Sequence, residues 1–169
     1  MTNGAGLIKL VLMRRRSTNF LRFIIFILGA GVLALGLFAL PSVWRGGSAE
    51  FPEASQALLL IILGLYATAI PFFIALWQAL KLLRYLDQGT AFSTLSAEAL
   101  NKIKRCAVVI AVLYVGGVPL LFPIAETDDA PGLVVIGMAI ALAPITVAVF
   151  TTILERLLQT TLDQKSKEG

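Results

Sequence analysis

The sequence contains no histidine and a single cysteine, Cys106. A disulfide within the chain is therefore excluded, and so is a metal site built from histidine and cysteine ligands. A serine nucleophile would lack histidine, its usual base. A glycine-rich phosphate-binding loop is absent as well. We therefore expect no enzyme activity, no catalytic residue and no cofactor.

Charged residues are also scarce, at 14% of the chain, whereas hydrophobic residues make up 58%. Together with a mean hydropathy of +0.88, this apolar content exceeds what the core of one soluble domain uses. The composition is that of a membrane protein.

Long apolar stretches locate the membrane spans. A bilayer core about 30 Å thick is crossed by about 20 apolar residues in a helix. Four stretches meet this requirement, at residues 23–40, 57–83, 106–124 and 133–154. Only a few residues join the third and fourth, so these two must form an antiparallel hairpin. The sequence predicts an all-α polytopic membrane protein of four transmembrane helices in two antiparallel hairpins.

Lysine and arginine predict the orientation, because basic residues next to a span are retained in the cytoplasm. Thirteen of the fourteen basic residues lie before the first span, in the second loop with the adjoining end of the second span, or after the fourth span. Arg45 alone lies in an external loop. Both termini are therefore expected on the cytoplasmic side of the membrane. This divides the chain into a basic segment (1–22), a transmembrane domain (23–154) and a cytoplasmic tail (155–169).

The first apolar stretch has a second interpretation, a cleaved signal peptide, because a basic block precedes it and the small residues Gly47 and Ala49 follow it. Its 18 apolar residues exceed a usual signal core, and Trp44 and Arg45 lie close to the cleavage point. We therefore favour an uncleaved span.

A weak internal repeat relates the two hairpins. Gly64 precedes Pro71 by seven residues in the second span, and Gly137 precedes Pro144 by seven in the fourth. Duplication explains this match, and so does chance, because glycine and proline are frequent in membrane helices. Each proline removes a backbone hydrogen bond, so both helices are expected to bend near mid-span.

The second loop carries the most ordered polar segment. Gly89 is expected to end the second helix in a left-handed conformation, and Ser93 or Thr94 to cap the next one. The simple interpretation is an elbow anchored at the lipid headgroups, and the alternative is a docking surface for a cytoplasmic partner. The candidate docking residues are Asp87, Gly89, Phe92, Ser93, Lys102, Lys104 and Arg105.

The third loop, "AETDDAPG", concentrates three carboxylates, Glu126, Asp128 and Asp129. Asp128 or Asp129 can cap the fourth helix, whose first N–H groups need acceptors. The surplus carboxylates form a weak candidate site for an external cation, although calcium usually takes six to eight oxygen ligands. We favour capping over a metal site.

Two segments of the sequence resemble a known family. The stretch "LDQGTAFS" in the second loop and the turn ending "DDAPG" are similar to those of the Domain of Unknown Function 2975 family. The resemblance covers about residues 20–158. It implies a four-span bacterial inner-membrane protein, often encoded beside a small helix-turn-helix regulator, and it transfers no functional residues.

Two functions compete. The first is sensing or regulation through a cytoplasmic helix-turn-helix partner, and the second is transport, resistance or immunity at the membrane. Lys81, near the cytoplasmic end of the second stretch, is the one Asp, Glu, Lys, Arg or His within the four apolar stretches. The lack of such groups deeper in the membrane argues against an ion-coupled carrier and favours the first function. The expected partners are the lipid bilayer and that regulator, with a homo-oligomer left open and no direct nucleic-acid binding.

Overall fold

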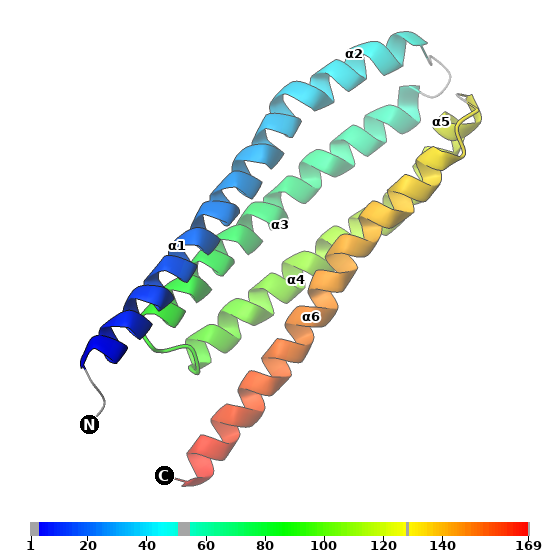
Figure 1. Ribbon diagram of the computed structural model, residues 1–169. Helices are drawn as coiled ribbons and strands as arrows, with labels where there is room; N and C mark the ends of the chain where they lie inside the picture. Colours follow the sequence, from blue (N-terminus) through cyan, green and yellow to red (C-terminus); the bar gives the residue numbers. More distant parts are fainter. Residues whose placement is uncertain (1–3, 51–54, 128, 169) are drawn as a thin grey trace.

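The computed structural model describes residues 4–50, 55–127 and 129–168, and these residues form helices joined by turns (Figure 1). The elements are α1 (Gly4–Ala34), the π-helical turn η1 (Leu35–Ala39), α2 (Leu40–Glu50), α3 (Ser55–Asp87), α4 (Thr94–Gly117), the 3-10 turn η2 (Val118–Leu120), α5 (Leu121–Thr127) and α6 (Gly132–Glu168).

Four helical segments are long and apolar enough to cross a membrane, at Thr18–Gly47, Ser55–Asp87, Thr94–Glu126 and Gly132–Lys167. This confirms the predicted all-α class and its four spans. Both chain termini lie at the same end of the molecule (Figure 1). We call this the basic end, because Arg22, Arg84, Arg105 and Arg156 lie there, and the opposite end, where α2 and α5 lie, the far end.

The four spans lie side by side in the order α1, α3, α4, α6 (Figure 1). The most extensive contacts join α4 to α6 and α3 to α4, whereas α1 makes its main contact with α3. Many large apolar side chains point away from the protein, among them Phe23, Phe26 and Phe38 of the first span. Lipid chains satisfy such side chains without cost, as expected for a membrane protein.

The helices extend past the predicted apolar stretches at the basic end. α6 continues to Glu168 through the segment predicted as a tail, and α1 begins at Gly4 within the predicted basic segment. The two predicted kink residues lie inside continuous helices, Pro71 in α3 and Pro144 in α6. The lost backbone hydrogen bonds therefore do not interrupt either helix.

The elbow between α3 and α4 forms as predicted. Gly89 has a φ of 75°, and the N–H of Thr90 donates to the carbonyl oxygen of Tyr85 at 3.0 Å, which closes a helix-ending motif. Ser93 caps α4, since its side chain accepts a hydrogen bond from the N–H of Ser96. The chain reverses here through residues whose conformations are each locally favoured.

The third span is not one regular helix. Val118 to Leu120 form a 3-10 turn, with Pro119 at its start. Proline has no N–H to donate to the preceding helical turn, and Gly116 and Gly117 weaken the helix before it. Helix α5 then carries the chain to the far end. The sequence predicted a span over 106–124, and the structure adds this change of helix type within it.

The first span also contains an irregular turn, the π-helical η1, in which the N–H of Leu40 donates to the carbonyl oxygen of Leu35. A π turn disturbs the regular backbone ladder, and membrane helices need other donors where this happens. The hydroxyl of Tyr66 on α3 donates to the carbonyl oxygen of Gly36 at 2.7 Å. This bond fixes the irregular turn against α3.

We predict that Tyr66→Phe lowers the free energy of unfolding by about 1 kcal/mol, because the phenyl ring keeps the packing and removes the hydrogen bond. Equilibrium unfolding in mixed micelles measures this change. Tyr114→Phe is the matched control, since the Tyr114 hydroxyl makes no hydrogen bond within the described residues. Equal effects of the two substitutions would show that the bond to Gly36 contributes nothing.

Candidate functional site

The basic end contains a buried carboxylate, Glu155 of α6, which is 6% exposed. Its Oε1 accepts a hydrogen bond from the Asn101 side chain at 2.9 Å, and its Oε2 accepts one from the Lys104 ammonium. Both donors come from α4, three residues apart and therefore on one helix face. A buried carboxylate is tolerated only with such donors, so this cluster holds α4 and α6 in one register.

The position of this cluster along the helices is defined by the sequence. Glu155 directly follows the fourth apolar stretch, and Arg105 directly precedes the third. The cluster therefore lies where both helices leave the apolar layer. At this level ammonium and carboxylate groups can pair while remaining close to water and headgroups.

A polar cavity of about 330 Å³ opens beside Glu155, between α4 and α6. Within it Lys102 pairs with Glu98 at 2.7 Å, and both side chains are largely exposed. Arg105 is exposed and forms no ion pair with any described residue. The lining residues are Ala97, Glu98, Asn101, Lys102, Arg105, Glu155 and Gln159.

A third ion pair joins α1 to the end of α3. The Arg22 guanidinium contacts a carboxylate oxygen of Asp87 at 2.8 Å. Asp87 was predicted as a docking residue, but its carboxylate is already paired with Arg22 of the same protein. The pair is partly exposed, so its contribution to stability is small, but it orients the start of the elbow.

The other predicted docking residues divide into structural and accessible ones. Gly89 and Ser93 form the helix-ending motif and the cap, and Lys104 is engaged by Glu155. Phe92 remains 66% exposed, and its neighbour Leu95 is 52% exposed. We call these two side chains the elbow surface. Lys102 and Arg105 lie instead in the polar cavity.

The acidic turn at the far end has a different role from the predicted one. Asp128 lies outside the described residues, and Asp129 has a φ of 47°. The N–H of Ala130 donates to the carbonyl oxygen of Ala125 at 2.9 Å, so Asp129 occupies the left-handed position that ends α5. Aspartate tolerates this conformation better than most residues. The predicted cap of the fourth helix was Asp128 or Asp129. Asp129 ends α5 instead, so that alternative is wrong, and the alternative with Asp128 stays a prediction.

The acidic turn does not bring together metal ligands among the residues that the structure describes, where no group of three suitable side chains is found. Glu126 is exposed at the end of α5. The described part of the turn thus serves chain reversal, and the cation site stays a prediction.

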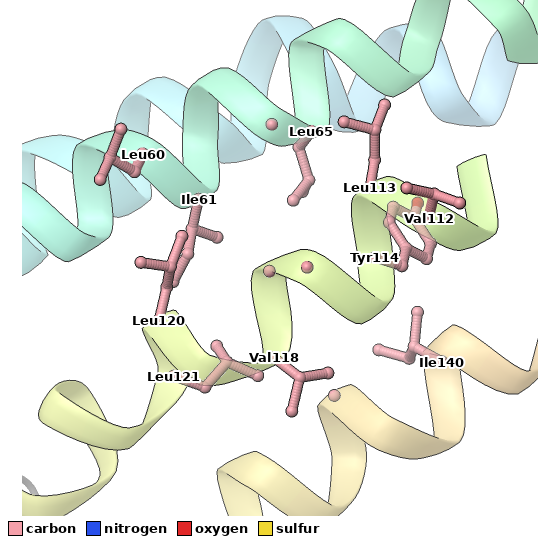
Figure 2. Close-up of a pocket in the computed structure, with 14 residues that line it drawn as sticks. Leu60, Ile61, Leu65, Val112, Leu113, Tyr114, Val118, Leu120, Leu121 and Ile140 are labelled. Atoms are coloured by element: carbon pink, nitrogen blue, oxygen red, sulfur yellow. The ribbon is translucent and has the colours of Figure 1, made fainter. Parts of the chain in front are cut away.

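An apolar cavity of about 480 Å³ lies in the far half of the bundle, between α3, α4 with η2, and α6. Figure 2 shows Leu60, Ile61 and Leu65 facing Tyr114, Val118 and Leu121 across it, with Ile140 at its edge. Gly64 and Gly137, the two glycines of the weak repeat, both line this cavity. The sequence did not indicate that they line the same cavity.

Three residues that line the polar cavity were not predicted from the sequence: Asn101, Glu155 and Gln159. The position of Glu155 could have been recognised in the sequence, because an acidic residue directly at the end of an apolar stretch needs a partner there. Nothing in the sequence identified that partner, because Lys104 and Asn101 lie about 50 residues earlier in the chain.

We predict that Lys104→Met destabilises the protein by about 2 kcal/mol, because it leaves a buried carboxylate with one donor only. Lys104→Met/Glu155→Leu should recover part of this loss, since the double variant removes the unpaired charge. Unfolding in mixed micelles measures both. Lys102→Met is the matched control, because its pair with Glu98 is exposed, and we expect a change within about 0.5 kcal/mol. A double variant less stable than the single one would contradict the assignment.

Comparison with known proteins agrees with the helical membrane architecture. The chain is 44% identical over 155 residues to the "Uncharacterized membrane protein YoaS" of Bacillus subtilis (strain 168), and the match covers 92% of this chain and 97% of the relative. No solved structure matches. The model of the family described as "Protein of unknown function (DUF2975)" matches residues 42–167, which include both cavities and the elbow. The chain belongs to this family of membrane proteins.

Proposed function

We propose that this protein is a non-enzymatic regulator in a bacterial cytoplasmic membrane, which passes a signal from the membrane to a helix-turn-helix partner. The observation that carries the proposal is the elbow surface. Phe92 and Leu95 are both more than half exposed at the tip of an ordered turn. Exposed apolar side chains on an ordered element are typical anchors for a protein partner.

The elbow surface is held in place by several bonds. Ser96 is 1% exposed, and its hydroxyl donates to the carbonyl oxygen of Thr90 at 3.3 Å. Leu83 of α3 and Leu100 of α4 are buried on either side of the turn. The turn therefore presents its two apolar side chains at little cost in conformational entropy, which favours tight docking.

The charge distribution supports a cytoplasmic position for the elbow. Basic residues are retained on the cytoplasmic side, and Lys81, Arg84, Lys102 and Lys104 flank the turn. The resemblance to a family often encoded beside a small helix-turn-helix regulator supports that class of partner. Such a regulator would bind DNA itself, so the membrane protein needs no nucleic-acid contact.

We predict that Phe92→Ser/Leu95→Ser weakens binding of the regulator at least about tenfold, because it removes both apolar anchors. The full-length protein and the helix-turn-helix protein encoded beside its gene are co-purified in detergent, and their affinity is then measured by interferometry.

Leu157→Ser is the matched control, because Leu157 is 61% exposed on α6 beyond the same end of the spans. This variant should bind the regulator normally. The proposal fails if no such regulator co-purifies with the parent protein, or if the control loses as much affinity as the elbow variant.

One observation favours a second function, transport or resistance at the membrane. The apolar cavity in the far half is bounded by three spans and lined almost entirely by aliphatic side chains and glycine. A cavity of this volume is of the size that small apolar ligands occupy. Ion coupling finds no support, since the one Asp, Glu, Lys, Arg or His of the four apolar stretches is Lys81, near the basic end of the second.

Filling this cavity separates the second function from the first. A β-carbon at Gly64 has open space, and Gly64 lines the cavity, so Gly64→Leu should occupy it without a clash. We predict that this variant abolishes any protection against toxic peptides or cationic amphiphiles, as measured by growth inhibition.

Gly31→Leu is the control, since Gly31 also has open space but does not line the cavity. Both variants exchange glycine for leucine inside a helix and gain similar helix propensity. Equal sensitivity of the parent, both variants and a strain lacking the protein would exclude the second function.

A further inference from the structure

We propose that the polar cavity between α4 and α6 binds the headgroup of an amine-bearing phospholipid, of the phosphoethanolamine type, from the leaflet at the basic end. This site goes beyond the proposed function, because neither residue of the elbow surface lines the cavity. Its ligand follows from three observations: the depth of the cavity, one unpaired cation and one weakly engaged carboxylate.

The depth of the cavity matches the level of lipid headgroups. Arg105 directly precedes the apolar stretch of α4, and Glu155 directly follows that of α6. Both residues line the cavity. Since the two helices leave the apolar layer at the same level, the cavity lies where phosphodiester and amine groups of lipids are concentrated.

Arg105 supplies the contact for the phosphodiester. It is the cation of the cavity that makes no ion pair with a described residue, whereas Lys102 pairs with Glu98. A guanidinium binds two phosphate oxygens at once, and it is more weakly hydrated than an ammonium. The amide groups of Asn101 and Gln159 also line the cavity and offer further N–H donors.

Glu98 supplies the contact for the lipid amine. Both oxygens of Glu155 already accept hydrogen bonds from Asn101 and Lys104. Glu98 is engaged only by Lys102, its side chain is 61% exposed, and exposed pairs of this kind are weak. A primary ammonium can therefore bind Glu98 while the phosphodiester binds Arg105.

The two charges lie on one face of α4, so one zwitterionic group can contact both. Glu98, Lys102 and Arg105 follow each other at intervals of four and three residues, so they form one stripe on α4. An anionic glycerol headgroup would bind Arg105 but brings no ammonium, so Glu98 would keep only its exposed pair with Lys102. A choline headgroup cannot donate a hydrogen bond to Glu98. The stripe thus discriminates by the amine as well as by the phosphate.

Lipid retention by the full-length protein tests the proposal. The protein in detergent is titrated with phosphatidylethanolamine, phosphatidylcholine or phosphatidylglycerol of identical chains, and bound lipid is counted by native mass spectrometry. We expect phosphatidylethanolamine to bind about tenfold more tightly than the other two. Arg105→Gln should lower its binding about tenfold, and Glu98→Gln should abolish the preference over phosphatidylglycerol.

Arg84→Gln is the matched control, because Arg84 directly follows the second apolar stretch at the same end but lies outside the cavity. It should retain lipid as the parent does. Equal binding of the three lipids, tighter binding of phosphatidylglycerol, or an equal loss in Arg84→Gln would overturn the proposal. Free phosphoethanolamine binding more tightly than the lipid would overturn the assignment to the membrane.

Discussion

The burial of one carboxylate constrains the arrangement of the helices. Between apolar helices in lipid, contacts of leucine with leucine are little better than contacts of leucine with lipid, so apolar faces alone fix register poorly. Glu155 can be buried only where Asn101 and Lys104 reach it. This fixes α6 along α4. Since α3 packs on the same α4, the elbow and both cavities depend on that register.

Features determined by neighbours in the chain could be predicted from the sequence. Four apolar stretches predicted four spans, because each helix must satisfy its own backbone in lipid. Gly89 and Ser93 marked the end of one helix and the start of the next, since a left-handed residue and a capping hydroxyl act within one turn. Asp129 shows the limit of this reasoning, because the same acidic residue could start α6 or end α5, and the structure uses it for the second purpose.

Features determined by distant partners could not be predicted. Asp87 was recognised as a polar residue of the elbow, but its partner Arg22 lies 65 residues earlier. The π turn of the first span depends on the hydroxyl of Tyr66, 30 residues later. The sequence shows that a stretch is apolar. It does not show which side of the helix packs against a neighbouring helix, because almost every side of the helix is apolar. For the same reason the sequence could not predict that Gly64 and Gly137 line one cavity.

Helix α4 is the element shared by all candidate sites. Its first turn carries Leu95 of the elbow surface. Residues between 97 and 105 line the polar cavity, and residues between 112 and 117 line the apolar one. A helix of 24 residues is about 36 Å long. A ligand in the far half can affect the elbow only if it binds two arrangements of α4 with different affinity. Gly116, Gly117 and the 3-10 turn after them make the far end of α4 the least regular part of the span, whereas Lys104 and Glu155 fix its other half. A shift that carries a signal must therefore move α4 and α6 together at the basic end, or break that ion pair.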